Sequence, residues 1–377
     1  MSPQALVTGA TGFVGRNLVR ILCAHGWSVR ALVPPTERAS AAVDPRAETV
    51  EGDITVPDSL RGSMDGVDGV FHLAGLVTSW VQDPTEFTRV NVGGTENVIE
   101  EALRAGVTRF VFTSSMSGIG VRPGEVVRED SPPGRVFGAY EASKAAAERR
   151  VTTAVRERGL PGIVLIPSII LGPGDVRNAG QLMLSFCRGE APGVFAEETI
   201  LPVVGVEDVA RAHLLAYERG RVGERYIVSS EDRPWGELMR IASDYSGTPL
   251  PSRRIGPTML WLASRLGQAK SRITHRAPQL PPWVADFMLT GARMDASKSV
   301  RELGMNYRPI AESIHAAIDW FRDEGLLTPR PAPQAPLPPG GVENPLESAR
   351  PGTRPARLPD DMTPKPRSPK APEGPTS

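Results

Sequence analysis

The sequence holds only two cysteines among 377 residues, Cys23 and Cys187, and neither stands in a metal-binding spacing. A disulfide framework is therefore excluded, and the chain fits a reducing compartment. An excess of charge is also lacking, since Lys and Arg together number 43 and so do Asp and Glu. The balanced charge therefore creates no overall electric field that would draw the chain to nucleic acid or to an anionic membrane. From the spacing of the two cysteines we predict no metal site.

Long apolar runs are missing as well. No segment of the sequence approaches the roughly 20 apolar residues that a membrane span requires. The chain begins without a basic region followed by an apolar stretch, so we expect no export signal. The expected protein is cytoplasmic and has no membrane span.

Glycine, in contrast, is plentiful, and residues 8–15 read Thr-Gly-Ala-Thr-Gly-Phe-Val-Gly. They follow the apolar run 5–7 and precede a helical pattern, the order of strand, turn and helix that opens a dinucleotide fold. Gly9 would permit the tight turn, Gly12 the close approach of a pyrophosphate, and Gly15 the packing of the helix on the sheet. The start of the helix would then offer free N–H groups to phosphate. The alternative is a loop that only turns the chain.

Strand and helix patterns alternate from residue 4 to about residue 170. Apolar runs predict strands at 4–8, 28–33, 49–52, 70–74, 110–114 and 163–166, and helical spacing predicts helices at 12–24, 59–64, 86–104 and 138–158. Such alternation builds a parallel sheet with helices on both faces. The expected fold is α/β, a Rossmann-type doubly wound parallel sheet over residues 1–174, whose core can also take in elements from 200–230.

Beyond residue 174 the pattern is less regular. Helices are expected at 178–188, 206–218, 235–246, 296–303 and 310–324, with a strand at 225–228. Residues 259–266 carry apolar side chains at helical spacing, which we interpret as facing the core. These elements predict a smaller substrate-binding lobe over residues 175–327, at the carboxyl edge of the sheet. Four large side chains are expected to pack in the core rather than to line a pocket: Trp80, Phe137, Met183 and Phe186.

Proline changes the character of the chain near its C-terminus, because 15 of the 37 prolines lie in the last 49 residues, which contain no aromatic residue. A segment with so little to bury cannot offset its ordering entropy. We therefore expect a disordered Pro-rich tail over residues 328–377. Its Pro-x-x-P spacings would also suit a partner-binding segment, but a plain tail is the simpler expectation.

Tyr140 and Lys144 stand four residues apart on the helix expected at 138–158, and hence on one face of it. An ammonium beside a phenol favours the phenolate and brings the pKa of the phenol closer to working pH. The pair would serve as acid and base in interconverting a carbonyl and an alcohol. Ser115 follows the strand expected at 110–114 and can hydrogen-bond the same substrate oxygen. Without such a partner, Tyr-x-x-x-Lys is usually only a solvated helix face.

Seven segments follow one another along the chain in an order that is specific when taken together. They are 8–15, Gly52-Asp53-Ile54, Phe71-His72-Leu73-Ala74-Gly75, Asn91-Val92-Gly93-Gly94-Thr95, Thr113-Ser114-Ser115, Tyr140-x-x-x-Lys144 and Leu171-Gly172-Pro173-Gly174-Asp175. With these segments the chain resembles the extended short-chain dehydrogenases/reductases, also called the NAD-dependent epimerase/dehydratase family. The resemblance covers roughly residues 4–325.

This resemblance implies a nicotinamide dinucleotide site with Ser115, Tyr140 and Lys144 as the catalytic residues. The implied cofactor contacts are Gly9, Thr11, Gly12, Phe13, Val14, Gly15, Asp53, Ile54, Leu73, Ala74, Gly75, Asn91, Ser114, Tyr140, Lys144, Pro167 and Ser168. Asp53 and Ile54 would hold the adenine, residues 73–75 would line the pyrophosphate and ribose, and Pro167 and Ser168 would lie near the nicotinamide. From the residues alone, Asp53 could instead cap a helix, because Pro57 and Asp58 follow it.

Within the family, segments 205–213 and 223–227 resemble the dihydroflavonol-reductase and 3β-hydroxysteroid-dehydrogenase branch. Leu201-Pro202-Val203 stands where sugar-nucleotide members usually carry an Arg-Asp-aromatic run, which disfavours a sugar-nucleotide substrate. No acid stands directly at the end of the second strand, where Val33-Pro34-Pro35 is found. NADP is therefore favoured over NAD as the cofactor, with Arg38 on the extra phosphate.

The resulting prediction is an NAD(P)-dependent oxidoreductase that interconverts a ketone or aldehyde and an alcohol on a small, largely apolar substrate. The alternative is an NAD-dependent sugar epimerase or dehydratase that recycles its bound cofactor. A third hypothesis is a cofactor-sensing binding protein that uses its tail for interaction. We expect no nucleic-acid partner, and a homodimer through the helices at 86–104 and 138–158, as in related enzymes.

Overall fold

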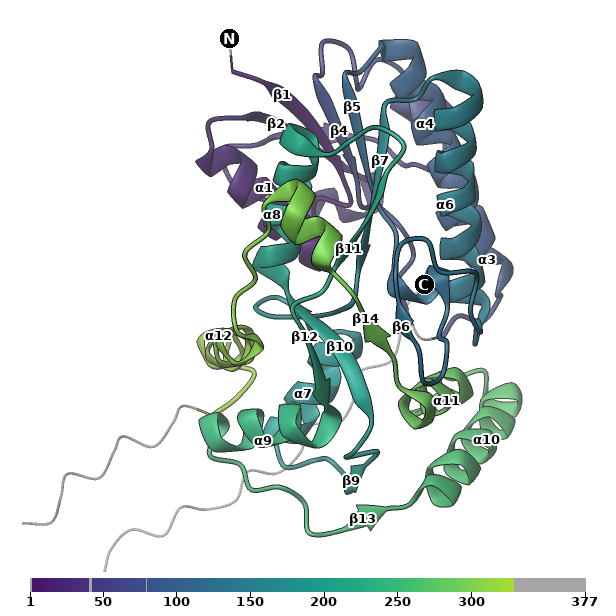
Figure 1. Cartoon of the computed structure of the whole chain (residues 1–377), viewed down its shortest axis with the longest axis vertical. Coiled ribbons are helices and arrows are strands. Elements are labelled where there is room, and N and C mark those ends of the chain that lie inside the picture. Colours follow the sequence, from purple (N-terminus) through teal and green to yellow (C-terminus); the bar gives the residue numbers. More distant parts are fainter. Residues whose placement is uncertain (1, 41–42, 79, 329–377) are drawn as a thin grey trace, which may run out of the picture. The chain divides into compact units, whose positions relative to one another are not determined.

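The computed structural model describes residues 2–40, 43–78 and 80–328, and Figure 1 shows how its elements are arranged. Within these residues the centre is a sheet of seven parallel strands in the order β11-β7-β5-β4-β1-β2-β3. The strands are β1 (Gln4–Thr8), β2 (Ser28–Val33), β3 (Glu48–Glu51), β4 (Gly69–His72), β5 (Arg109–Thr113), β7 (Gly162–Pro167) and β11 (Arg225–Val228). The predicted doubly wound parallel sheet is confirmed. The tail predicted at 328–377 lies outside the described residues from position 329 onward.

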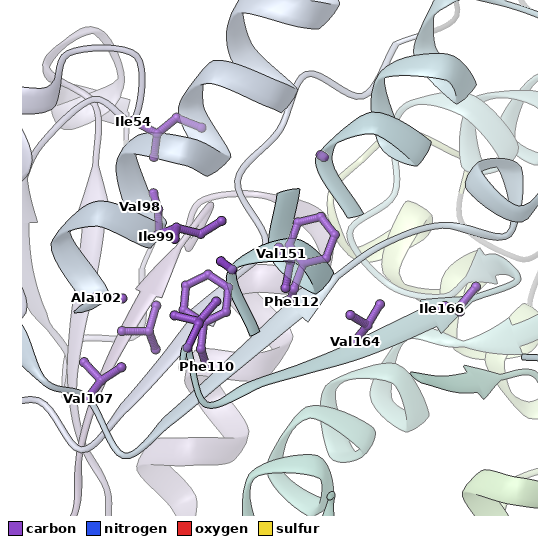
Figure 2. Close-up of a cluster of buried hydrophobic side chains, with 14 of the residues drawn as sticks. Ile54, Val98, Ile99, Ala102, Val107, Phe110, Phe112, Val151, Val164 and Ile166 are labelled. Carbon is purple, nitrogen blue, oxygen red and sulfur yellow. The ribbon is translucent and has the colours of Figure 1, made fainter. Parts of the chain in front are cut away.

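Apolar side chains on both faces of the sheet explain why its strands read as continuous apolar runs. Successive side chains of a strand point to opposite faces. In β5, Phe110 and Phe112 enter one core, whereas Val111 enters the other. Figure 2 shows part of the first core, with Phe110 and Phe112 among aliphatic side chains such as Val151.

Helices cover both faces of the sheet. The first core is closed by α2 (Pro57–Leu60), α4 (Gly94–Ala105) and α6 (Ala139–Arg158), and the second by α1 (Phe13–Ala24) and α8 (Val206–Arg219), which pack together (Figure 1). The domain built around the central sheet thus includes α8 and β11, which come from residues 206–228. The boundary between residues 174 and 175 stays a prediction.

The helix predicted at 86–104 is interrupted in the structure. It consists of α3 (Thr85–Phe87), the π-helical η2 (Thr88–Gly93) and then α4. At the start of α4, a Cβ on Gly94 would lie 2.5 Å from the side chain of Ile54. π-Helical turns of this kind are frequent at functional sites, and η2 buries Asn91.

A smaller lobe surrounds a third core that includes side chains of α7, α9 and α12. The remaining elements are η1 (Pro35–Ser40), α5 (Met116–Ile119), β6 (Val126–Val127), β8 (Ile169–Leu171), α7 (Asn178–Cys187), β9 (Val194–Phe195), β10 (Ile200–Gly205), β12 (Glu231–Pro234), α9 (Trp235–Ser246), β13 (Arg254–Ile255), α10 (Pro257–Thr274), α11 (Pro282–Thr290), β14 (Arg293–Met294), η3 (Ser299–Leu303) and α12 (Ile310–Asp323). Strand β14 pairs with β6, so the lobe returns to the loop that precedes α6.

Most apolar side chains of residues 259–266, in α10, do not face the core, contrary to our expectation. Met259, Leu262 and Leu266 are 53%, 49% and 62% exposed, whereas Leu260 is buried. The helix packs beside α11 (Figure 1) through its other side. Among the described residues, no helix has the combined length and apolar content that crossing a bilayer takes.

Candidate active site

The turn between β1 and α1 leaves no room for side chains. Gly9 has a φ of +68°, and a Cβ there would lie 2.7 Å from the backbone nitrogen of Ala74. A Cβ on Gly15 would lie 2.0 Å from the carbonyl oxygen of Gly9. Gly12 stands in extended conformation just before α1, and no side chain of the described residues caps the helix there. The first-turn N–H groups of α1 are thus not used by a capping side chain, an arrangement that suits phosphate.

A buried network brings the loop after β4 against this turn. Thr8 Oγ1 accepts hydrogen bonds from the backbone nitrogens of Leu73 (3.2 Å) and Ala74 (3.0 Å). The same hydroxyl lies 2.7 Å from His72 Nδ1. Burial lowers the pKa of His72 to about 3, so the neutral imidazole accepts the hydroxyl hydrogen of Thr8. The network holds the predicted contacts Leu73 and Ala74 against the turn at Gly9, and no local sequence pattern indicates it.

Asn91 extends this network to the loop that contains Gly75. His72 Nε2 lies 3.0 Å from Thr95 Oγ1, and Thr95 donates to the carbonyl oxygen of Asn91 at 2.6 Å. The Asn91 amide accepts a hydrogen bond from the backbone nitrogen of Leu76 (2.6 Å) and donates to Ser143 Oγ (2.8 Å). The amide is therefore engaged with protein groups and orders the loop. A direct contact between Asn91 and the cofactor stays a prediction.

Asp53 and Ile54 lie just after β3, at the carboxyl edge of the sheet. Asp53 Oδ1 accepts hydrogen bonds from both the backbone nitrogen and the hydroxyl of Thr55, each 2.8 Å long. The interpretation of Asp53 as a helix cap is wrong, because Val56 precedes α2 and no side chain caps that helix among the described residues. Ile54 is 7% exposed and packs against Gly94. The adenine roles of both residues stay predictions.

The end of β5 sends consecutive residues to opposite faces of the sheet. Thr113 faces α8, where its hydroxyl lies 2.6 Å from His213 Nε2. Burial lowers the pKa of His213 to about 4, and its Nδ1 bonds a backbone carbonyl of α8, so Nε2 accepts the Thr113 hydrogen. Ser114 faces α6, where its hydroxyl donates to Glu148, which is paired with Arg225 at 2.7 Å. A contact between Ser114 and the cofactor stays a prediction.

Lys144 reaches the same strand end from α6. Its Nζ donates a 2.7 Å hydrogen bond to the carbonyl oxygen of Thr113 and lies 4.8 Å from the centre of the Phe112 ring. The side chain is only 6% exposed. Burial lowers the pKa of Lys144 to about 8, against a smaller opposing effect of Glu148. The charge of Lys144 therefore responds to pH near neutrality.

Tyr140 lies one helical turn before Lys144 and next to Ser115. Burial raises the pKa of Tyr140 to about 12, although a hydrogen bond with Ser115 lowers it, and Glu141 adds to the rise. The expectation that the pKa of this phenol lies closer to working pH is wrong, because burial outweighs the effects that lower the pKa. At neutral pH the Tyr140 phenol is a proton donor.

Pro167 and Ser168 stand at the carboxyl end of β7. The backbone nitrogen of Ser168 donates to Val228 at 3.0 Å, but its buried hydroxyl has no hydrogen-bond partner among the described residues. An unpartnered buried hydroxyl is a group that a bound ligand would satisfy. Across the turn, a Cβ on Gly174 would lie 3.6 Å from the ring of Phe13, so segment 171–175 meets the start of α1.

Residues after β2 place an acid beside the glycine turn. Glu37, in η1, accepts a 2.6 Å hydrogen bond from the hydroxyl of Thr11. A carboxylate in this region is what NAD binders offer to the ribose hydroxyls. The sequence shows Glu37 shortly after the strand end but assigns it no role, since only the turn of η1 brings its carboxylate back to Thr11. Arg38 follows in η1, and its side chain is outside the described part of the structure.

The groups around the turn fit a nicotinamide dinucleotide. The glycines let β1, α1 and the loop after β4 approach one another closely, and the uncapped start of α1 suits the charge of a pyrophosphate. The unpartnered hydroxyl of Ser168 stands at the same sheet edge. These observations come from three separate elements, so the fit does not depend on the glycine pattern alone.

A cavity of about 450 Å³ opens beside Tyr140. Its walls are mostly aromatic and apolar, as is usual for sites that bind small organic molecules. The lining residues are Trp80, Val81, Gln82, Pro84, Phe87, Ala139, Tyr140, Gln268, Ser271, Arg272, His275, Pro281, Pro282 and Trp283. The expectation that Trp80 packs in the core is wrong, whereas Met183 and Phe186 are buried in the lobe core as predicted.

The comparison with family models is consistent with this geometry. The model of the NAD dependent epimerase/dehydratase family matches residues 5–229. The chain belongs to this family. As a family member of the extended short-chain dehydrogenase/reductase type it is an enzyme with a nicotinamide cofactor, which confirms the resemblance.

Individual relatives extend the match beyond the sheet domain. A Synechocystis sp. protein named as a dihydroflavonol 4-reductase is 35% identical over 340 residues, which cover 87% of this chain and 97% of that protein. Sterol demethylase protein B of Methylococcus capsulatus is 34% identical over 335 residues, covering 85% and 99%. The crystal structure of gox2253 superimposes with a TM-score of 0.77 at 35% identity, covering 87% of this chain and 100% of the other. The similarity therefore includes the smaller lobe of this epimerase/dehydratase family member.

Proposed function

We propose that this enzyme interconverts a ketone or aldehyde and an alcohol on a small, largely apolar substrate, with Ser115, Tyr140 and Lys144 as catalytic residues. One observation carries the proposal: Tyr140 lines the apolar cavity and lies close enough to Ser115 for the Ser115 hydroxyl to lower the pKa of the phenol. Lys144 lies one turn further along α6, with its ammonium buried at the end of β5.

A bound nicotinamide supplies or accepts the hydride. In the reducing direction Tyr140 donates its proton to the substrate oxygen, since its raised pKa keeps the phenol protonated at neutral pH. Ser115 holds that oxygen through its hydroxyl. The positive charge of Lys144 stabilises the phenolate that remains, and its buried position makes this charge effective.

The apolar substrate is supported by the cavity and by the relatives. Trp80, Phe87 and Trp283 present rings to the space beside Tyr140. The two relatives described above carry a dihydroflavonol and a sterol in their names. In this chain Leu201 and Val203 are buried in β10, so this segment offers no cation to a sugar nucleotide. A reductase or dehydrogenase is therefore better supported than a sugar epimerase or dehydratase.

For the cofactor we propose NAD, with Glu37 on the ribose hydroxyls. The hydrogen bond between Glu37 and Thr11 supports it, because it holds the carboxylate beside the glycine turn. The initial preference for NADP relied on Arg38 and on the absence of an acid directly after β2. That preference stays a prediction, as do the cytoplasmic location and the homodimer.

The experiment that tests the catalytic proposal is Tyr140→Phe, assayed with a panel of apolar ketones and secondary alcohols. We expect turnover to fall roughly 10²–10⁴-fold, the range that a positioned general acid contributes, with NAD affinity unchanged. Tyr217→Phe is the matched control, because Tyr217 lies on α8 and packs against Trp27. Unchanged turnover of Tyr140→Phe would remove Tyr140 from the mechanism. Epimerisation without net change of the cofactor would favour the alternative.

A further inference from the structure

Helix α10 exposes most of its large apolar side chains, and its buried side is formed by one leucine and two serines. Its outer stripe, defined as Met259, Leu262, Leu266 and Ile273, is 53%, 49%, 62% and 81% exposed. Its buried side consists of Leu260, Ser264 and Ser271. At 100° per residue these two sets lie on opposite sides of the helix. A helix that packs on a core normally shows the reverse arrangement.

No other part of the described chain shows such a surface. Twelve large apolar side chains are exposed among the described residues, and five of them, the outer stripe and Trp261, lie in α10. The other seven are all valines, scattered from Val56 to Val300. Single exposed valines need no explanation, but a continuous apolar stripe marks a surface that contacts something.

The charged residues in the segment around α10 are all basic. Residues 245–285 contain six Lys and Arg and no Asp or Glu, in a chain that is neutral overall. Arg254 and Arg265 are paired with acids outside this segment. Lys270, Arg272 and Arg276 form no ion pair within the part of the chain that the structure describes. On the helix, Lys270 flanks one side of the outer stripe and Arg272 the other.

Two occupants match an apolar stripe of this length. The spacing of Met259, Leu262 and Leu266 would suit a second helix, including α10 of a second copy. A second copy, however, would bring the same bases and no acids, so like charges would face each other. An anionic lipid surface offers acyl chains to the stripe and phosphates to the flanking bases. Complementarity of charge therefore selects the lipid surface.

We propose that α10 docks on the surface of an anionic lipid bilayer, with its outer stripe in the headgroup region and Lys270 and Arg276 on lipid phosphates. The opposite side of the helix is turned to the cavity, which Gln268 and Ser271 line together with Tyr140. An apolar substrate dissolved in the bilayer would thus meet the cavity behind α10. This consequence rests on the proposed function, but the docking itself does not.

The test is sedimentation of the full chain with vesicles of phosphatidylcholine alone or mixed with phosphatidylglycerol. We expect the wild type to sediment with the anionic vesicles, and at least tenfold weaker binding for the double variant Leu262→Glu/Leu266→Glu. Val56→Glu/Val222→Glu is the matched control, because both valines are similarly exposed and the charge change is the same. Lys270→Glu/Arg276→Glu should also weaken binding, and Arg61→Glu/Arg156→Glu should not. Nucleotide affinity, measured for each variant, verifies the fold.

Several results would overturn the docking. These are no sedimentation of the wild type with either vesicle, equal binding to neutral vesicles, or equal losses in the Val56/Val222 control. A dimer in solution that Leu262→Glu/Leu266→Glu splits, without vesicle binding, would assign the stripe to a second copy. Vesicle binding by a protein that turns over no alcohol or carbonyl compound would contradict the proposed function and still support the docking of α10 on the lipid surface.

Discussion

The ammonium of Lys144 donates a 2.7 Å hydrogen bond to the carbonyl oxygen of Thr113, at the last residue of β5. The hydroxyl of the same threonine meets His213 of α8 at 2.6 Å. Thr113 therefore joins α6 and α8, which cover opposite faces of the sheet. Its position decides where the ammonium of Lys144 lies, although its own hydroxyl faces α8.

Replacing Thr113 with Val tests this positioning role. Valine has nearly the same shape but leaves Nε2 of the buried His213 without its donor, so we expect a loss of about 1–3 kcal/mol in the free energy of unfolding. We also expect a lower kcat with little change in nucleotide affinity, because Lys144 shifts with the strand end. Denaturant unfolding and steady-state kinetics measure the two effects. Thr113→Ser keeps the hydroxyl and should restore both; a Ser variant as impaired as Val would contradict the role.

The buried charge of Lys144 predicts a pH dependence of stability. Its pKa is about 8 in the folded chain and 10.5 ordinarily, so the unfolded chain binds this proton more tightly. Below pH 8 the lysine therefore destabilises the fold, and this penalty disappears as the pH rises from about 8 toward 10.5. Relative to Lys144→Met, the wild type should gain on the order of 2 kcal/mol between about pH 7 and pH 10.

Urea unfolding at the two pH values measures this gain. Both proteins keep Tyr140, whose raised pKa acts in the opposite direction above pH 10, so its effect cancels in the comparison. Lys270→Met, at an exposed lysine, is the control and should run parallel to the wild type. A stability difference between wild type and Lys144→Met that does not change with pH would contradict the burial of the charge.

The glycine turn predicts different outcomes for two alanine substitutions. A Cβ at Gly15 would lie 2.0 Å from the carbonyl oxygen of Gly9, so Gly15→Ala must displace α1 from the turn. We expect loss of nucleotide binding and destabilisation of roughly 1–3 kcal/mol or more, the usual cost of overpacking. Gly93→Ala has open space around its Cβ and a helical backbone, and should be neutral or slightly stabilising. Nucleotide titration and thermal unfolding of both variants measure these outcomes, and equal effects of the two substitutions would contradict the prediction.

The position of the Glu37 carboxylate beside Thr11 predicts that the enzyme prefers NAD to NADP. Glu37→Gln removes the negative charge beside Thr11, and we expect NAD affinity to fall about tenfold while NADP affinity rises or stays. Glu48→Gln, an exposed acid on β3, is the control. Both affinities are measured by fluorescence titration. A wild type that binds NADP more tightly, with a ratio that Glu37→Gln leaves unchanged, would support Arg38 as the phosphate ligand instead.

Much of the central sheet could be predicted, since its signals are local. β1, β2 and β11 have the predicted bounds, because an apolar run buried on both faces differs clearly from its flanks. β10 was missed because Pro202 interrupts its apolar pattern, and β12 because Glu231-Asp232-Arg233-Pro234 has no apolar residue. Both strands lie in the lobe, where pairing partners rather than sequence pattern specify the strand.

For the candidate site, the sequence placed Tyr140 and Lys144 on one helix face and predicted the bare glycine turn. It could not show that His72 and His213 anchor the surrounding elements, because their partners Thr8 and Thr113 are distant in the chain. Nor could it show that Asn91 is occupied by Leu76 and Ser143.

By itself the sequence determined the features that depend on neighbouring residues: the strand-turn-helix opening, the alternation that builds a parallel sheet, and the spacing of the phenol and the ammonium. Only the tertiary structure decided the direction of the Tyr140 pKa, the return of Glu37 to the glycine turn and the outward face of α10. Each of these depends on which distant segment covers a side chain. The local pattern of a segment shows its apolar face, but which distant segment covers a given side chain is decided only when the chain folds.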